Sequence, residues 1–521
     1  MTGRDTESGG VPTEPVVVAA VDLGATSGRV MLGRVAGASA GTAGSAGILE
    51  LEEIARFPNE PVQREDGLHW DIAALREAVL DGLADACASA SRAGERIASI
   101  GIDSWAVDYG VLRGGDLLIE PFHYRDGRND HGVERVHAAV PFEELYGRNG
   151  LQFLPFNTLY QFAADDAIAG ADAIVGADET AGSGAGADEG ILLIPDLFAY
   201  WLTGERVAEE TNASTTGLVP AAEPEPRWDA ELATRIGVPV GTLPRIVRPG
   251  STIGTLTPEI AERTGLRAGT PVIAVGSHDT ASAVVATPLQ GKGSVFVSCG
   301  TWGLVGVETA APVLSAEARD SGFTNERGVD GTTRLLHNVM GLWVLNECLS
   351  AWRRDPVDPS APAEAGGGLA ELLDAAADPD VRFTVFDIDD PRLLPPGDMP
   401  ARVAALCREA GGYVPGSRPE YVRSIVESLA DAFARAAAQA SALAGTPLEA
   451  INLVGGGARN ALLCQATADR ARVSVIAGPV EATAIGNVLV QARTAGAVTG
   501  SLADLRALVS ATQRTTRYEP R

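Results

Sequence analysis

The sequence predicts an α/β protein with buried sheets, and three observations favour this fold class. Short runs rich in Val and Ile alternate with alanine-rich segments of helical period. Apolar runs of this kind are typical of strands covered on both faces. A strand–turn–helix unit recurs in both halves of the chain. The length of 521 residues corresponds to roughly two to four structural units at about 150 residues each.

Four segments are predicted to run from a strand into a turn. They are VVVAAVDLG from Val16, SIGIDSWAVDYGVL from Ser99, TPVIAVGSHD from Thr270 and AINLVGGGARN from Ala450. In open α/β sheets, ligands bind at the carboxyl ends of the strands. We therefore look for functional residues in these four turns.

Two segments carry the strongest helical pattern. The first spans residues 68–90 with Asp71 near its start, and the second spans residues 422–445 and is closed by Gly445. Residues 1–14 lack hydrophobic periodicity and are expected to form a loose tail. Three stretches rich in Ala, Gly, Asp and Ser are expected to be extended surface loops, near residues 37–47, 165–190 and 358–368.

The charge balance excludes several classes of partner and chemistry. Lys and Arg number 41 against 68 Asp and Glu, which gives a formal net charge of −27. Such a surface repels phosphate backbones and anionic lipid, so we expect no nucleic-acid partner and no membrane partner. Lys292 is the single lysine and lies outside any GxxxxGK[ST] motif. A phosphate-binding loop of that type is therefore absent, and nucleotide handling must use another scheme.

The cysteines and the amino terminus favour a cytoplasmic protein. The 5 cysteines are widely spaced, without a CxxC pair or a zinc pattern. A reducing compartment suits them best. The first ten residues, MTGRDTESGG, are polar and acidic where a signal peptide is basic and then apolar. The chain also lacks an apolar run of about 18 residues, so we expect no membrane span.

Two hairpin-like turns are candidates for phosphate binding. The first, DLGATSGR from Asp22, joins a strand that ends in a carboxylate to a returning strand. Its amides and hydroxyls can surround phosphate oxygens, and Asp22 would hold a magnesium ion through water. The alternative is a plain tight hairpin whose aspartate caps its own turn. The second, SVFVSCGTWGLVGVE from Ser294, repeats this layout, so two facing hairpins can clamp a triphosphate.

Two further turns carry a candidate base and a candidate adenine site. In GSHDTASA from Gly276, Asp279 is placed to accept a proton from a substrate hydroxyl that His278 and Thr280 orient. The alternative for Asp279 is a helix N-cap, and the residues alone do not decide between the two. In LVGGGARN from Leu453, three glycines expose backbone on which a flat adenine can lie, although triple glycine is also common in plain loops.

In this order and over this length, the motifs resemble the FGGY family of carbohydrate kinases, within the actin, Hsp70 and hexokinase superfamily. The resemblance runs from about residue 16 to about residue 506. It rests on VDLGATSGRVMLGR, GIDSWAVDYGVL, YRDGRND, GLQFLPFNTLYQF, IPDLFAYWLTGE, SHDTASAVVATPL, CGTWGLVG, HNVMGLWVLNECL and GPVEATAIGN. It implies two actin-like (ribonuclease H-like) domains, at residues 15–285 and 290–510, with a catalytic cleft between them.

Within the family, the FLPFNTLYQ and NVMGLW blocks resemble the members that act on L-rhamnulose. The resemblance then implies ATP with Mg2+ and L-rhamnulose as substrates, L-rhamnulose 1-phosphate as product, and a monomer or homodimer. It assigns the general base to Asp279. The implied sugar contacts are Ala106, His278, Asp279, Thr280 and Asn338. The implied nucleotide contacts are Ala25, Thr26, Ser27, Gly28, Arg29, Thr301, Asn346 and Gly456, with Asp22 on the metal side.

Two positions depart from the family pattern. Ala106 stands where related kinases have glycine, so its methyl group narrows the expected sugar pocket. Asn346 stands where the family usually has glutamine, so its contact with the nucleotide would be one methylene shorter. Two alternatives stay open: a kinase for a related ketose such as L-fuculose, and a non-catalytic sugar or nucleotide sensor on the same fold. Retention of Asp22, Thr301 and Asp279 speaks against the sensor, which has no use for the base.

Overall fold

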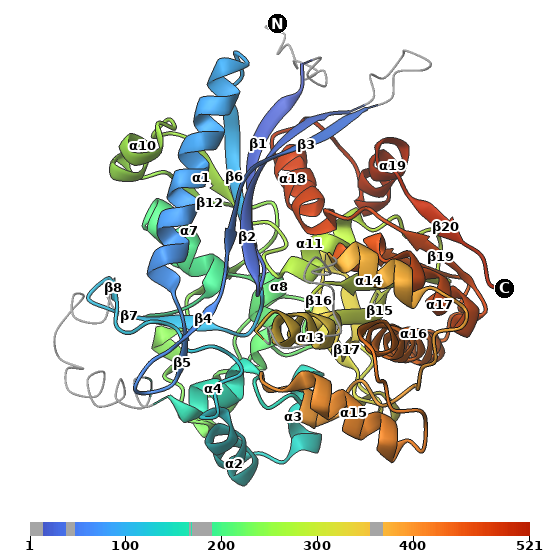
Figure 1. Cartoon of the computed structure of the whole chain (residues 1–521). Helices are drawn as coiled ribbons and strands as arrows, with labels where there is room; N and C mark the ends of the chain where they lie inside the picture. The colour runs from blue at the N-terminus through green and yellow to red at the C-terminus, as the bar shows by residue number, and fades with distance from the viewer. Residues whose placement is uncertain (1–13, 38–46, 166–167, 169–189, 355–367) are drawn as a thin grey trace, which may run out of the picture.

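The structure, a computed structural model, describes residues 14–37, 47–165, 168, 190–354 and 368–521 (Figure 1). The predicted tail at 1–14 and the predicted loops at 37–47, 165–190 and 358–368 fall outside the described residues, apart from a few residues at their ends. The described chain is organised around two large sheets, one from each half of the sequence. We call the parts built on them the first lobe and the second lobe.

The sheet of the first lobe has six strands in the order β12-β13-β6-β1-β2-β3. These strands are β1 (Val16–Leu23), β2 (Ser27–Ala36), β3 (Ile48–Pro58), β6 (Ile97–Ser104), β12 (Thr252–Thr255) and β13 (Pro271–Ile273). β1 pairs antiparallel with β2 and parallel with β6, and β6 pairs parallel with β13. The carboxyl ends of β1, β6 and β13 therefore meet at one edge, as the strand-to-turn segments predict.

The sheet of the second lobe repeats this arrangement with seven strands, in the order β16-β17-β15-β14-β18-β19-β20. These strands are β14 (Ser294–Cys299), β15 (Gly303–Thr309), β16 (Thr324–Arg327), β17 (Thr333–Val339), β18 (Ala450–Val454), β19 (Ser474–Ala477) and β20 (Thr516–Tyr518). The β14–β15 hairpin lies beside parallel β18 and β19, as the β1–β2 hairpin lies beside β6 and β13. Both predicted hairpins thus begin a sheet of the same topology.

Both predicted long helices form, with different starts. α1 spans Ile72–Arg92, and Asp71 is its N-cap, whose side chain accepts a hydrogen bond from the Ala74 amide. The predicted start at residue 68 is wrong because β5 (Leu68–Trp70) pairs with β4 (Pro61–Gln63) as a short hairpin. α16 spans Arg418–Leu443, four residues longer at its start than predicted, because Ser417 and Glu420 form a capping box there.

Two central helices, α11 (Asp279–Ala286) and α18 (Ala482–Thr494), pack against each other between the lobes (Figure 1). α18 follows β19 of the second sheet in the chain but packs on β1, β2 and β6 of the first, while α11 also touches β14 of the second. They approach closely at Gly486, where a Cβ would lie 1.8 Å from the Ser282 carbonyl oxygen. Only glycine therefore permits this crossing.

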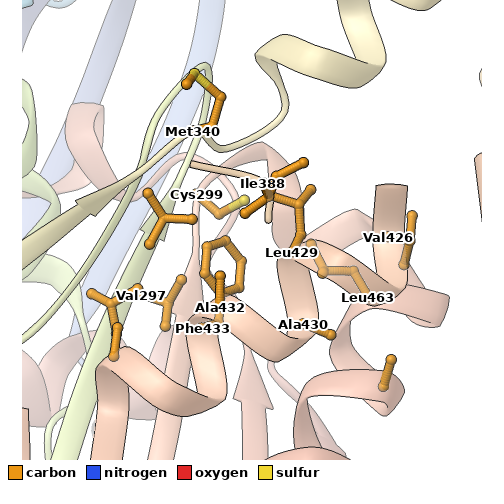
Figure 2. Close-up of a cluster of buried hydrophobic side chains, with 14 of the residues drawn as sticks. Val297, Cys299, Met340, Ile388, Val426, Leu429, Ala430, Ala432, Phe433 and Leu463 are labelled. Carbon is orange, nitrogen blue, oxygen red and sulfur yellow. The ribbon is translucent and has the colours of Figure 1, made fainter. Parts of the chain in front are cut away.

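The largest core lies between the second sheet and α16 (Figure 2). Val297 and Cys299 of β14 face Phe433 and Leu429 of α16, and all four side chains are fully buried. Gly303 of β15 leaves room for the Phe433 ring, which a Cβ at that position would meet at 2.5 Å. This packing fixes the β14–β15 turn relative to the rest of the lobe.

Smaller elements complete the two lobes. The short strands are β7 (Tyr109–Arg113), β8 (Asp116–Leu117), β9 (Gly190–Leu193), β10 (Val207–Glu209) and β11 (Arg245–Val247). The first-lobe helices are α2 (Asn129–Ala139), α3 (Phe142–Asn149), α4 (Thr158–Ala164), α7 (Ile194–Thr203), α8 (Glu210–Ala213), α9 (Ala230–Arg235) and α10 (Pro258–Thr264). Those of the second are α12 (Ala316–Asp320), α13 (Trp343–Arg354), α14 (Leu369–Ala376), α15 (Met399–Glu409), α17 (Ala461–Ala471) and α19 (Leu502–Thr512).

Two predictions about the chain as a whole concern membrane spans and the state of the cysteines. None of the helices in the described segments is both long enough and apolar enough to span a membrane. The cysteines, all of them described, form no disulfide, and Cys299, Cys348, Cys407 and Cys464 are buried. Burial raises the pKa of the Cys407 thiol to about 11 and that of Cys348 to about 12. These thiols therefore act as small apolar core residues.

Candidate active site

A cavity of about 610 Å³ opens between the lobes, where the carboxyl ends of β1, β6 and β14 meet the start of α11. Both hairpin turns and the glycine-rich turn after β18 line it. All but two of the predicted site residues lie on its wall: Asp22, Ala25, Thr26, Ser27, Arg29, Ala106, His278, Asp279, Thr280, Thr301, Asn338 and Gly456. The fold thus brings together residues that lie as much as 434 positions apart in the chain, from Asp22 to Gly456.

Two predicted nucleotide contacts, Gly28 and Asn346, are not among the residues that line the cavity. Gly28 is buried beneath the first turn, where a Cβ would meet the Phe57 ring at 2.2 Å. Its part is to let β2 and β3 pack closely below the turn. Asn346 is an exposed residue of α13, and its amide donates to the Leu342 carbonyl within that helix.

The first hairpin turn is braced from a neighbouring segment. The Gly24 amide donates to the Ser27 carbonyl at 3.0 Å, which closes the turn. The Asn59 side chain donates to the Gly24 carbonyl at 2.8 Å, and the Asn59 amide donates to the Thr26 carbonyl at 3.1 Å. With the carbonyl groups of Gly24, Thr26 and Ser27 engaged, the turn lines the cavity with Thr26 exposed, which suits an anion site.

The second hairpin turn and the glycine-rich turn lie against each other. Gly455 has a left-handed backbone, with φ of +82°, and a Cβ there would be 2.9 Å from the Cys299 carbonyl oxygen. This close approach leaves Gly456 exposed on the cavity wall beside Gly300 and Thr301. Exposed backbone at Gly456 therefore lies on the same cavity wall as Thr301.

Arg29 joins the two lobes across the cavity. Its guanidinium donates to Asp22 Oδ2 from Nε at 2.9 Å and from Nη2 at 2.6 Å, and its Nη1 donates to Glu481 at the start of α18. Burial alone would lower the pKa of Arg29, but the charges of Asp22 and Glu481 outweigh burial and raise it. Arg29 thus remains a cation beside the place expected for phosphate.

Asp279 is the first residue of α11, and it does not cap that helix. His278 occupies the N-cap position, and the Asp279 carboxylate instead accepts a hydrogen bond from the Thr280 hydroxyl at 3.0 Å. Its side chain is 33% exposed, into the cavity. Removal from bulk water raises the pKa of Asp279, and the negative charge of Asp22 raises it further, against the opposing effect of His278. The alternative of a structural N-cap is therefore not observed.

The residues around Asp22 suit a divalent cation that is held mainly by its own substrate. Asp22 Oδ2 is engaged by Arg29, and the described residues give Oδ1 no hydrogen bond. No group of three or more His, Cys, Asp or Glu side chains forms a metal centre within the described ranges. Mg2+ is usually held by one or two carboxylates, waters and substrate phosphates, so a single free carboxylate oxygen fits it.

The sequence analysis did not single out Asp103. It lies on β6 directly beside Asp22 in the β1–β6 register, is fully buried, and accepts a hydrogen bond from Asn487 of α18 at 2.5 Å. Its Oδ1 is buried without a partner among the described groups. Burial, with the charge of Asp22, raises the pKa of Asp103 well above the ordinary value. The pairing of β1 with β6 could not be read from the sequence alone.

An apolar and aromatic wall, also not anticipated, covers the side of the cavity beyond Ala106. It consists of Trp105, Val107, Tyr124, Leu151, Leu154, Phe156 and Trp302. The Phe156 and Trp302 rings, from different lobes, lie 5.5 Å apart. Gln152 holds the predicted Asn338 by accepting from its backbone amide at 3.2 Å and its side-chain amide at 3.1 Å. Phe156 and Gln152 belong to the GLQFLPFNTLYQF block, which carries part of the family resemblance, so that block was the sequence signal for both residues.

Models of two protein-family domains match nearly the whole chain. Residues 17–286 match the N-terminal domain of the FGGY family of carbohydrate kinases, and residues 295–495 match its C-terminal domain. A protein named rhamnulokinase from Bacteroides thetaiotaomicron is 40% identical over 502 residues, which cover 96% of this chain and 95% of that protein. The rhamnulokinase of Pectobacterium carotovorum is 39% identical over 505 residues, which cover 97% of this chain and 93% of that protein.

Solved structures share the fold at low sequence identity. A gluconate kinase from Lactobacillus acidophilus superposes with a TM-score of 0.70 at 16% identity, covering 97% of this chain and 94% of that one. A glycerol kinase from Plasmodium falciparum, solved with ADP, superposes with a TM-score of 0.69 at 14% identity, covering 97% and 95%. The expectation of two actin-like domains is therefore confirmed.

Proposed function

Because this chain belongs to the FGGY family of carbohydrate kinases, we propose that it transfers the terminal phosphoryl group of ATP to the 1-hydroxyl of L-rhamnulose. The products are L-rhamnulose 1-phosphate and ADP. The relatives named rhamnulokinase, at 37–40% identity over most of the chain, support this choice of sugar. The observation that carries the chemistry is Asp279, whose partly exposed carboxylate faces the cavity that both hairpin turns line.

Asp279 orients the 1-hydroxyl and accepts its proton. Phosphoryl transfer passes through a loose transition state, so the acceptor oxygen needs alignment more than it needs a strong base. The raised pKa of Asp279, which burial causes, makes its carboxylate a stronger base than an exposed aspartate. His278 and Thr280 flank the same hydroxyl, and the Thr280 hydrogen bond fixes one oxygen of the carboxylate so that the other faces the acceptor.

The phosphate groups of ATP lie between the two hairpin turns. Amides after Gly24 and the Thr26, Ser27 and Thr301 groups donate to phosphate oxygens, and Arg29 adds positive charge. A bound Mg2+ would neutralise further phosphate charge, with Asp22 holding it through water. The adenine lies against the exposed backbone at Gly456. Because the cavity lies between lobes, their closure excludes water that would otherwise hydrolyse ATP.

The sugar occupies the part of the cavity near Ala106 and Asn338. The apolar wall from Trp105 to Trp302 suits a deoxy sugar, which has a methyl group where other ketohexoses have a hydroxymethyl group. We also propose lobe boundaries at 15–285 and 290–510, a monomer or homodimer, no nucleic-acid or membrane partner, and a cytoplasmic site of action. The five unpaired cysteines support the last point.

A coupled assay of ADP release tests this function with a panel of ketoses. We expect L-rhamnulose to have the highest kcat/KM, ahead of L-fuculose. A different ketose that exceeds it by a wide margin would overturn the choice of sugar. Asp279→Asn should retain the fold and ATP binding by calorimetry but lose turnover by several orders of magnitude. Turnover that stays at the wild-type rate in Asp279→Asn would contradict its role as the base.

A further inference from the structure

A buried carboxylate, that of Asp108, lies behind the apolar wall of the cavity without lining the cavity itself. Its Oδ2 accepts hydrogen bonds from the indole Nε1 of Trp70 at 2.6 Å and of Trp105 at 3.0 Å, and from the Tyr124 amide at 3.3 Å. Its Oδ1 accepts from Gln161 Nε2 at 2.9 Å. Indole and backbone N–H groups can only donate, so the direction of the three bonds to Oδ2 follows from the groups alone.

The side-chain amide of Gln161 is also oriented by its surroundings. Besides Asp108 Oδ1, its Nε2 lies 2.9 Å from the Phe156 carbonyl oxygen and 3.3 Å from the Val107 carbonyl oxygen. Because all three neighbours are acceptors, the NH2 group of Gln161 must face them. Gln161 therefore joins the Asp108 carboxylate to the backbone of Phe156, which belongs to the apolar wall.

The carboxylate and its donors depend on one another. Burial raises the pKa of Asp108 to about 6, while the hydrogen bonds that it accepts lower the pKa, so the group is ionised at neutral pH. Trp70 and Trp105 are buried, and the described residues offer their indole N–H groups no acceptor other than Asp108. Loss of this acceptor would leave both indoles with an unsatisfied buried donor.

The chain between Trp105 and Asp108 makes a turn that needs support from its surroundings. Val107 has a left-handed backbone with φ of +72°, which is rare for a β-branched residue. Its carbonyl oxygen accepts from Thr158 Oγ1 at 2.8 Å, and the Trp105–Asp108 hydrogen bond closes across the turn. Such conformations persist only where neighbouring groups hold them, and they cluster at ligand sites. This turn carries Ala106, which lines the predicted sugar site.

We infer that Asp108 is a positioning residue for sugar binding, which holds the aromatic wall of the sugar pocket in place from behind. The wall residues that it holds, directly or through Gln161, are Trp105, Tyr124 and Phe156. Groups that bind a ligand must be kept within about 0.5 Å of their working positions by supporting hydrogen bonds. The inference deepens the proposed function and rests on it for the place of the sugar.

The wall that Asp108 supports is also where the second lobe meets the sugar pocket. Trp302 Nε1 donates to the Tyr124 hydroxyl at 3.4 Å, and the Trp302 and Phe156 rings lie 5.5 Å apart. Asp108 therefore supports both first-lobe residues that Trp302 contacts in this wall. The phosphates of ATP are expected between the hairpin turns, on another side of the cavity, so Asp108 should affect the sugar and not the nucleotide.

The test compares Asp108→Asn with Asp229→Asn. Asparagine has the shape of aspartate, but its NH2 group replaces one acceptor oxygen, so a donor then faces a donor. Asp229 lies in the same lobe, accepts from the Leu232 amide at 3.0 Å as the N-cap of α9, and does not line the cavity. Its variant therefore makes the same change away from the site. Full-length proteins are assayed by ADP release with the ketose that the wild-type enzyme prefers, and thermal unfolding reports folding.

Two further measurements support this comparison. Gln161→Met removes the donor on the other side of the same carboxylate, so it tests the inference even if Asp108→Asn does not fold. In protein labelled with 15N at its 7 tryptophans, the indole N–H signals of Trp70 and Trp105 report their bonds to Asp108 without any sugar. Trp70→Phe and Trp105→Phe assign these signals.

We expect the KM for the sugar to rise about tenfold in Asp108→Asn and in Gln161→Met, the scale for a buried donor left without its acceptor. The KM for ATP should not change, and Asp229→Asn should keep both wild-type KM values. The indole signals of Trp70 and Trp105 should shift in Asp108→Asn. An unchanged sugar KM in either folded variant, or KM values for sugar and ATP that rise alike, would overturn the inference.

These outcomes can be told apart from a failure of the proposed function. The assay uses the preferred ketose, so an error in the choice of L-rhamnulose leaves the comparison of KM values intact. If the wild-type enzyme phosphorylates no ketose, the proposed function fails and the indole signals decide. Signals of Trp70 and Trp105 that do not shift in Asp108→Asn would then overturn the inference.

Discussion

Gly486→Ala should damage both stability and turnover, because Gly486 sets the distance between α11 and α18. An added Cβ would lie 1.8 Å from the Ser282 carbonyl oxygen, whereas real Cβ contacts essentially never fall below 3.0 Å. The two helices must therefore separate by about 1.2 Å, the difference between these distances. Overpacking of this kind costs roughly 1–3 kcal/mol, and more when backbone must move. The Ser282 carbonyl lies three residues beyond Asp279, so the shift displaces the base.

Misplacing a reacting group by about 1 Å can lower the rate about 100-fold, and we expect a loss of that order in kcat for Gly486→Ala. Thermal unfolding and the coupled ADP assay measure the two effects. Gly147→Ala is the matched control, since Gly147 is also helical, in α3, and a Cβ there meets nothing within 4 Å. The control should be slightly stabilised, by up to about 1 kcal/mol, with full activity. A Gly486→Ala enzyme with wild-type melting temperature and kcat would refute the reasoning.

Three further predictions concern the site. Glu209→Gln should lower kcat about tenfold and stability by roughly 1–3 kcal/mol, because Glu209 Oε2 accepts hydrogen bonds from the Ser277 amide at 2.9 Å and from the Ser277 hydroxyl at 2.7 Å, just before the base. Steady-state kinetics and unfolding measure the two effects. Unchanged kinetics would count against this prediction. In a pH profile of kcat/KM, activity should fall as the pH drops through the pKa of Asp279 in the folded protein. The midpoint should lie above the ordinary 3.8, because burial raises that pKa. An acid limb with its midpoint at or below 3.8 would contradict the burial argument. Ala106→Gly should reduce the ratio of kcat/KM for L-rhamnulose to that for L-fuculose about tenfold, the scale of one methyl group in a pocket. The KM for ATP should not change. An unchanged kcat/KM ratio would mean that the Ala106 methyl group does not touch the sugar.

Local signals predicted the parts of the fold and site that lie within one stretch of chain. Strand β1 (Val16–Leu23) ends one residue after Asp22 and leads into the turn, as the apolar run followed by Gly, Thr and Ser indicates. The His278–Thr280 turn lies where a strand meets a helix, so its place at the carboxyl edge of the sheet could be predicted as well. The start of α1 was wrong because the short strand at residues 68–70 depends on pairing with residues 61–63, which helical periodicity does not report.

Residues that act through contacts distant in sequence could not be predicted. Asp108 is an ordinary acidic residue until β5 and α4 bring Trp70 and Gln161 to it, 38 and 53 positions away by residue number. Asp103 lies beside Asp22 only because β6 pairs with β1 in that register. Asn346, in contrast, was assigned through family resemblance, and its exposed place on α13 lies outside the cavity wall.

The crossing of α11 and α18 explains why these distant contacts concentrate at one site. Each lobe contributes one helix to the boundary between the lobes. α11 begins with Asp279 and touches β14, while α18 begins beside Glu481 and packs on β1 and β6. Asn487 of α18 reaches Asp103, and Glu481 reaches Arg29, which holds Asp22. The groups around the predicted phosphate site and the base are therefore held by the same pair of packed helices, so we expect a substitution that displaces either helix to disturb both.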